Sequence, residues 1–476
     1  SSQVVSETRD AANATTETSF KFASKQVGNS TKLTVGKAGS VTGNANAITS
    51  GTGDATINVD GTVGGAVTAN ATGSSSSFAS KTTLFPAAPT DFITDSTQSN
   101  SAIGGAASVT VNAGGKAGFV SATGDKSAAV ANAGTISGVS ATSSRFVSPL
   151  SQSQSQKHTE VTSATGSVIT DTSSLSQQRG TAGGTVSVAN SAGGVINGGI
   201  SAVGQGDVTV SNDGIVLGTT NAVSSGSLNS STSSSSDVAT TVFGTPPALD
   251  VTTTVHTESD TDDTSSTGGS VTGNYAFANG DASFGSAVGH ITQSADKAST
   301  ATISGSVVGN VNSTAGNGFT NSFASNSTIT QVVDTAGNGT LSGNGTDTSK
   351  SSRNAGGVST VTISGAVKRG QFLGSANVNS TGREGSSVTV NSGLVEGSVS
   401  VTALGNDVSD NTTKTSGSQT ITAFNNITDS VTESGVSSSS VMAGDATANL
   451  LGSAKVDNSV SVFGVQSASA KIDSTA

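Results

Sequence analysis

The sequence predicts an all-β protein, a parallel β-solenoid (β-helix) of roughly 20-residue coils with long inserts that contain serine, threonine and proline. Three observations predict this fold. A glycine-bounded motif recurs along the chain, an alternating aliphatic triplet stands upstream of many copies, and neighbouring copies are separated by about one coil.

The recurring motif is G-x-[VIL]-x-G, of which only one or two copies, roughly, would be expected by chance. Glycine suits turns that need a positive φ or a close approach of two backbones, and the asparagine that often stands nearby tolerates the left-handed region. We therefore interpret each copy as one corner of a repeated coil. The copies begin at Gly39, Gly61, Gly134, Gly194, Gly214, Gly269, Gly305, Gly339 and Gly393.

The triplets place an aliphatic residue on either side of one polar or hydroxyl residue. Alternation sends the two aliphatic side chains to one face of a strand and the residue between them to the other. We expect short strands with one dry face, whose inward-pointing residues include Val35, Val59, Val111, Val188, Val210, Ile363 and Val390.

The spacing of the units excludes a helical crossover. Gly39 and Gly61 are 22 residues apart, and Gly194 and Gly214 are 20 apart, whereas a βαβ unit needs about 30 residues. Coils of two or three short strands remain, stacked in parallel at about 4.8 Å per coil around a narrow core. Asparagine and threonine side chains are expected to hydrogen-bond their copies one coil away.

Inserts interrupt the repeat at about residues 74–105, 143–182 and 223–268, and they contain all five prolines. Proline cannot donate to a strand ladder, so its exclusion from the repeat supports both assignments. We predict an N-terminal edge or cap over 1–30 and a solenoid over 31–476. The triplets beginning at Leu33, Val109 and Val186 suggest a superrepeat of two coils and one projecting loop.

The inserts share a short pattern in which two hydroxyl residues and a variable one precede phenylalanine: "TTLF", "SSRF" and "TTVF". These residues, Phe85, Phe146 and Phe243, have two interpretations. They pack the base of each insert onto the solenoid wall, as phenylalanine is often buried, or they form an exposed lip that contacts a partner or the neighbouring protomer.

Composition narrows the class of protein. Apolar residues are 32% and aromatic residues 3% of the chain, which is too little bulk for ordinary compact domains. The low charge and scarce proline oppose disorder. A net charge of −11 disfavours nucleic acid and anionic membranes as partners. There is no cysteine, and no apolar run is long enough to predict a transmembrane segment.

No pattern predicts catalysis. His158 and His256 stand near carboxylates, but no G-x-S-x-G frame places a nucleophile. We therefore predict no enzyme, and no metal or other cofactor. Calcium is the alternative, because the acidic run containing Asp260, Asp262 and Asp263 offers hard oxygen ligands. The run lacks the spacing of the known calcium loops.

Units such as "VTVNAGGKAGFVSATG" and "VTVSNDGIVLG" resemble the passenger repeats of large Gram-negative autotransporters and filamentous-haemagglutinin-like proteins. The resemblance implies an extracellular, outer membrane-associated solenoid, anchored through parts outside this chain. It implies an adhesin or structural scaffold that displays loops on a rigid rod and binds host or neighbour-cell surface molecules. The alternative is a self-assembling subunit of a surface filament or layer, whose partners are other copies of itself.

Overall fold

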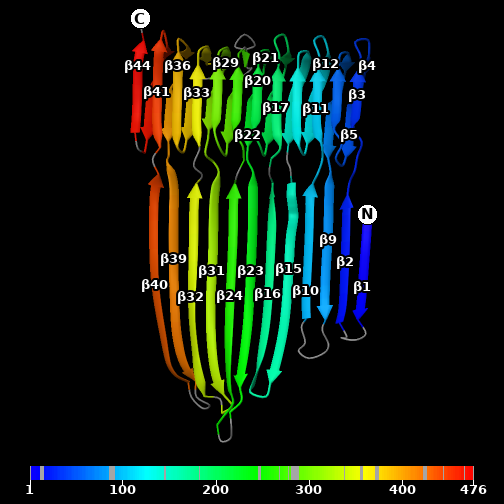
Figure 1. Ribbon diagram of the computed structural model, residues 1–476. Helices are drawn as coiled ribbons and strands as arrows, with labels where there is room; N and C mark the ends of the chain where they lie inside the picture. Colours follow the sequence, from blue (N-terminus) through cyan, green and yellow to red (C-terminus); the bar gives the residue numbers. More distant parts are fainter. Residues whose placement is uncertain are drawn as a thin grey trace.

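A computed structural model shows an all-β chain in which a parallel solenoid lies beside one long antiparallel sheet (Figure 1). The structure describes residues 2–10, 15–84, 92–143, 146–181, 183–244, 248–266, 268–276, 278–279, 289–336, 338–353, 357–369, 375–421, 426–442, 444–465 and 467–474.

The first solenoid sheet has twelve parallel strands, one from each coil. They are β3 (Thr31–Val35), β6 (Ala55–Val59), β11 (Ala106–Val111), β13 (Ser127–Asn132), β17 (Thr185–Asn190), β20 (Val208–Asn212), β25 (Val271–Tyr275), β28 (Ser299–Ile303), β33 (Val358–Ile363), β36 (Gly385–Asn391), β41 (Asp445–Gly452) and β44 (Ser467–Ser474).

Two further rows of parallel strands close the coil. One row contains β4 (Ser40–Val41), β7 (Thr62–Val63), β18 (Val195–Ile196), β21 (Ile215–Val216), β26 (Ala278–Asn279), β29 (Ser306–Val308), β34 (Ala366–Lys368), β37 (Leu394–Val395) and β42 (Lys455–Val456). The other contains β5 (Ala45–Ser50), β8 (Val67–Thr72), β19 (Ile200–Gly204), β22 (Thr220–Ser224), β27 (Ile291–Ala295), β30 (Val311–Thr314), β35 (Val378–Gly382), β38 (Val399–Ala403) and β43 (Val460–Gly464). Two long strands, β12 (Lys116–Gly124) and β14 (Thr135–Ser143), belong to both rows.

The antiparallel sheet, which we call the fin, also has twelve strands. In spatial order they are β1 (Ser2–Asp10), β2 (Thr15–Lys25), β9 (Ser74–Leu84), β10 (Phe92–Ala102), β15 (Phe146–Ser163), β16 (Gly166–Thr181), β23 (Ser227–Val242), β24 (Val251–Ser266), β31 (Phe319–Asp334), β32 (Gly339–Arg353), β39 (Asn406–Ile421) and β40 (Asn426–Met442).

The solenoid core consists of the alternating aliphatic residues. In β6 and β20 every second side chain is buried, and Val, Ile and Ala of successive coils form one continuous cluster. The predicted inward-pointing residues are all buried, from Val35 at 6% exposure to Val210 and Ile363 at 0%. The prediction of a parallel β-solenoid is therefore confirmed.

The glycine that begins the repeat motif is required by coil stacking. The carbonyl of Gly39 accepts a hydrogen bond from the amide of Thr62 in the next coil, and that of Gly194 accepts one from Ile215. A Cβ atom on Gly61 would lie 2.2 Å from the Gly39 carbonyl oxygen, and one on Gly214 would lie 2.3 Å from that of Gly194. Close backbone approach, and not a positive φ, explains these glycines.

Polar residues inside the solenoid are stacked and paired. Asn132 Nδ2 donates to Asn190 Oδ1 at 2.8 Å, and Asn190 Nδ2 donates to Asn212 Oδ1 at 2.8 Å. The stack ends where Asn212 meets Tyr275 of the next coil. Burial raises the pKa of the Tyr275 phenol well above its ordinary value. These ladders confirm that asparagine hydrogen-bonds its copies one coil away.

Further along, the interior ladder changes to serine. Ser299 and Ser313 hydroxyls lie 2.8 Å apart, Ser359 donates to Ser313, and Ser380 donates to Ser359 at 2.8 Å. Because each hydroxyl both donates and accepts, a buried row of serines satisfies itself without water. The interior therefore accommodates polar residues wherever one coil matches the next.

The inserts are β-hairpins that pair with one another, not separate projecting loops. Hairpins β9–β10, β15–β16 and β23–β24 coincide largely with the three predicted inserts, but β31–β32 and β39–β40 lie within the part assigned to uninterrupted solenoid. The predicted N-terminal edge contains hairpin β1–β2 of the same sheet. The fin thus consists of six hairpins, and in the sequence each hairpin is separated from the next by two coils.

Three details of the predicted repeat are wrong. The motif at Gly339 lies on fin strand β32, and that at Gly269 leads into β25 of the first sheet rather than a corner. The register also pairs Val130 with Val109 and Val188, so the third superrepeat begins two residues later than Val186 suggested. A slip of two residues keeps the same side chains inside, which is why the pattern did not reveal it.

Candidate interaction surface: the two faces of the fin

The fin is a single layer. Among the described residues of its strands, burial is confined to Gly180 and Ser266, which lie at the end nearest the solenoid. Figure 1 shows the long strands from β15 to β40 running side by side away from the solenoid. Both faces of this sheet are therefore surface.

The pairing register divides the side chains between two faces, because directly opposed residues of antiparallel strands point to the same side. Asp171 is opposite Asp237, which is opposite His256. Residues two and four positions along each strand share that face. We call it the carboxylate face. Among the described side chains, its carboxylates are Asp171, Asp237, Glu258, Asp260, Asp262 and Asp347. Its basic residues are Arg179 and His256.

The opposite side, which we call the lysine face, carries every described lysine of the fin. Lys157 is opposite Thr172, which is opposite Ser236, in the row next to that of Asp171. The described lysines of this face are Lys25, Lys157, Lys350 and Lys414, and its carboxylates are Asp263 and, at the tip of a hairpin, Asp334. Most other side chains here are Ser, Thr or Val, as along β24 from Thr253 to Thr261.

Hydroxyl pairs bridge neighbouring fin strands. Ser173 and Ser235 hydroxyls lie 2.8 Å apart, Ser155 and Ser174 2.8 Å, and Thr241 and Thr252 3.0 Å. Without a dry interior, the sheet is held by its backbone ladder and by such cross-strand pairs, each contributing about 0.2–1 kcal/mol. This accounts for the serine-rich composition of the inserts.

Buried aspartates fix the hairpins to the solenoid. Asp125 Oδ2 accepts hydrogen bonds from the amides of Gly73 and Gly104, which flank hairpin β9–β10, at 2.9 and 2.7 Å. Asp125 is 6% exposed. A carboxylate that binds the amides on both sides of an insertion holds the two ends of the hairpin together.

Asp296 does the same for hairpin β23–β24. Its Oδ2 atom accepts from the amides of Gly226 and Gly268 at 3.0 and 2.6 Å and from the Ser266 hydroxyl at 2.8 Å. The residue is 4% exposed. Each aspartate directly follows the last strand of the coil after its hairpin, a position that no motif in the sequence marks.

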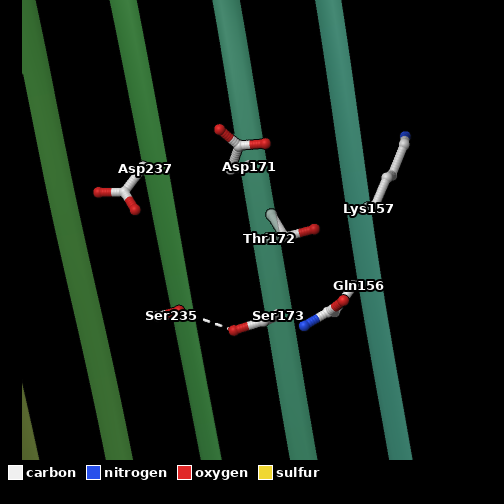
Figure 2. Close-up of a pocket in the computed structure, with 7 residues that line it drawn as sticks. All are labelled: Gln156, Lys157, Asp171, Thr172, Ser173, Ser235 and Asp237. Atoms are coloured by element: carbon white, nitrogen blue, oxygen red, sulfur yellow. Dashed lines mark hydrogen bonds between the residues drawn. The ribbon is translucent and has the colours of Figure 1, made fainter. Parts of the chain in front are cut away.

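An open depression lies over β15, β16 and β23 (Figure 2). Asp171, Ser173, Ser235 and Asp237 line it together with Gln156, Lys157 and Thr172. Beside it, His256 Nδ1 lies 2.6 Å from Asp237 Oδ1. By backbone register His158 is opposite Asp171, so a histidine stands at each end of a row of two aspartates. Among the described residues no hydroxyl is hydrogen-bonded to the Nε2 atom of His256.

The acidic run does not form one site. Asp260 and Asp262 are two positions apart in β24 and share the carboxylate face, whereas Asp263 points to the lysine face. The three carboxylates therefore cannot surround one calcium ion. Within the described part of the chain, no group of three or more His, Asp or Glu residues is arranged to hold a metal ion.

The three phenylalanines occupy different places. Phe146 is the first residue of β15, at the solenoid end of the fin, and Phe243 follows β23 at the opposite end, where its exposure is 44%. Phe85 lies outside the described residues, as does the side chain of Phe146. Phe146 and Phe243 therefore do not share one lip, and Phe243 does not pack against the solenoid wall.

Comparisons with known proteins add little. No family model and no curated protein matches the chain. Among solved structures the chain is similar to "a hyperactive, Ca2+-dependent, beta-helical antifreeze protein from an Antarctic bacterium", with 11% identity, 92% of this chain and 82% of that chain covered, and a TM-score of 0.22. A score this low carries no argument, so the assignment of a parallel β-solenoid comes from the strand pairing itself.

Within the described part of the chain, no helix is long and apolar enough to span a membrane.

Proposed function

We propose that the protein is a non-enzymatic structural scaffold of the bacterial cell surface, which acts through contact between its fin and other macromolecules. One observation carries this proposal: a twelve-stranded solenoid sheet and a twelve-stranded fin extend side by side. Two coils and one hairpin both add two strands, about 9.6 Å. Each added repeat therefore lengthens the solenoid sheet and the fin by the same distance, so the strands of the two sheets stay aligned along the whole molecule.

In this architecture a large part of the chain forms exposed sheet surface. The solenoid buries the aliphatic residues, and the fin displays two broad polar faces that the solenoid does not cover. A role in self-assembly, as a subunit of a surface filament or layer, is favoured by this exposed area. The repeat units that resemble autotransporter passengers support an extracellular location.

Electron microscopy of the purified full chain at several protein concentrations tests this proposal. We expect rods with a lateral sheet at low concentration and larger assemblies as the concentration rises. Rods that stay single at every concentration, and that also fail to coat or link bacterial cells, would contradict it.

Adhesion to a neighbouring cell is the second candidate, favoured by the exposed Phe243 at a hairpin tip. Phe243→Ser should then reduce binding to cells without changing self-association. Phe463→Ser, which removes a 59% exposed phenylalanine from solenoid strand β43, is the matched control. Equal cell binding by both variants would remove the hairpin tip from the adhesion hypothesis.

A further inference from the structure

We propose that the fins of two copies stack face to face, with the lysine face of one copy on the carboxylate face of the other. The partner is a second copy of this chain. This inference rests on the proposed scaffold function, and it identifies the surface through which copies join.

Charge complementarity is the first argument. Among the described fin side chains, six carboxylates lie on the carboxylate face with one arginine, whereas the other face has all four lysines and two carboxylates, Asp263 and Asp334. Alternation along a strand does not by itself sort charges by sign. Opposite potentials on the two sides of one sheet favour pairing of unlike faces and oppose pairing of like faces.

The charges also occupy the same band of the fin. The row of Lys157 adjoins the row of Asp171 and Asp237, and the row of Lys414 adjoins those of Glu258 and Asp260. A copy displaced along the normal to the sheet, without sliding along the strands, brings lysines over carboxylates. Stacked sheets lie about 10 Å apart, a distance that lysine and carboxylate side chains together can span.

Side-chain size is complementary as well. The carboxylate face carries protruding apolar residues, including Leu175, Phe323 and Ile329, of which the last two are each 42% exposed. The lysine face at the same level is dominated by Ser, Thr and Ala, such as Thr261 and Ala324. Large residues over small ones are the arrangement by which packed sheets interdigitate.

The available area is large enough for a stable contact. Strands of 16 residues such as β16 are about 54 Å long, and the eight strands from β15 to β40 span about 38 Å, so each face offers about 2,000 Å². A standard interface needs about 800 Å² per partner. In Figure 1 the fin strands stay nearly parallel across the sheet, and wide sheets with little twist are typically stabilised by stacking.

The two contacting faces are different, so this association is heterologous. A stacked pair keeps one free lysine face, on one copy, and one free carboxylate face, on the other, so the stack can continue without closing. The structure therefore favours an open-ended lateral stack over a closed dimer.

Charge-reversal variants of the full chain test the proposal. The first, Lys157→Glu with Lys350→Glu and Lys414→Glu, reverses the lysine face. The second, Glu258→Lys with Asp260→Lys and Asp262→Lys, reverses the carboxylate face. We expect each variant alone to self-associate at least about tenfold more weakly than the wild type in sedimentation velocity at low salt. Circular dichroism checks that each variant is folded.

The decisive measurement is the association of the two variants after they are mixed in equal amounts. Every contact between unlike copies then pairs opposite charges again, so association should return to near the wild-type level. A control chain with Lys32→Glu, Lys116→Glu and Lys455→Glu changes the solenoid exterior by the same charge and should associate like the wild type.

The outcomes separate the two proposals. Wild-type assembly that persists unchanged in both face variants, or a mixture that is not rescued, overturns face-to-face stacking and leaves the scaffold function standing. A wild type that neither assembles nor coats cells overturns both.

Discussion

The solenoid and the fin are built from similar residues in opposite ways. The solenoid hides every second side chain in a dry core, and its coils are so close that a glycine corner cannot accept a Cβ atom. The described side chains of the fin strands form no buried core, and the strands are joined by backbone ladders and paired hydroxyls. Regular alternation of aliphatic residues, and not overall composition, therefore decides which architecture a segment adopts.

The largest difference between the regions should appear when a charge is introduced. Val210→Asp places a carboxylate in the solenoid core, where the side chain has 0% exposure, at a cost of about 4 kcal/mol or more. Thermal unfolding followed by circular dichroism should show a large decrease in the melting temperature. Thr209→Asp on the exposed side of β20, and Ser234→Asp in the fin, which is opposite Ser174 and Ser259, should unfold close to the wild type. Similar losses in all three would show that the fin has a core too.

The junction between the regions should be the next most sensitive place. Asp296→Ala leaves the amides of Gly226 and Gly268 without their acceptor, at a cost of about 3 kcal/mol. We expect faster hydrogen exchange at the solenoid end of β23 and β24, with the solenoid core still protected. Asp263→Ala, which removes an exposed carboxylate from the same hairpin, is the control. Unchanged exchange in the Asp296 variant would show that the hairpin is not held by this carboxylate.

Within the solenoid, the asparagine ladder should matter to a smaller extent. Asn190→Ala removes the hydrogen bonds to Asn132 and Asn212 and so takes one buried partner from each of these two side chains, for about 2 kcal/mol. Urea unfolding measures this loss. Asn221→Ala, on the outer side of β22, should have little effect, and an equal effect of the two would contradict the ladder.

The smallest effect on the solenoid should follow from removing a whole hairpin. Deletion of residues 227–266 brings together ends that are already adjacent, since a Cβ atom on Gly268 would lie 2.7 Å from the Ser225 Cα atom. The coils should stay protected from hydrogen exchange. The fin, now two strands shorter than the solenoid sheet beside it, should separate into two parts. Loss of the cooperative unfolding of the coils would show that the hairpin belongs to the core.

The solenoid could be predicted from the sequence because each coil repeats a local rule. Triplets ending at Val59 or Val390 show which side is buried, and the glycine corners show where coils turn. The same rule cannot detect a register shift of two residues, because such a shift keeps the same side chains buried. It also assigned the motifs at Gly269 and Gly339 to coil corners wrongly, because any alternating segment flanked by glycines satisfies it.

The fin could not be predicted in the same way. Where its side chains are described, neither face of a fin strand is buried, so alternation carries no hydrophobic signal, and segments such as "SLNSSTSSSSDVATTV" look like solvated loops. Hairpins β31–β32 and β39–β40 contain no proline to mark them. The sorting of lysines and carboxylates onto two faces depends on the register between hairpins distant in sequence, for which a single chain gives no local cue.

The pairing of separate inserts into one sheet is the central claim, and the absence of cysteine from the chain makes it directly testable. Ser173 and Ser235 belong to different hairpins, and their hydroxyls are 2.8 Å apart (Figure 2). The variant Ser173→Cys/Ser235→Cys should form an intramolecular disulfide on mild oxidation of dilute protein, because the two residues are directly opposed and their side chains point toward each other at close range. The control Ser173→Cys/Ser236→Cys places the thiols on opposite faces and should not. Peptide mapping that finds the bridge only in the first variant is the predicted result, and a first variant that stays reduced, or bridging equal in both, would contradict a continuous fin.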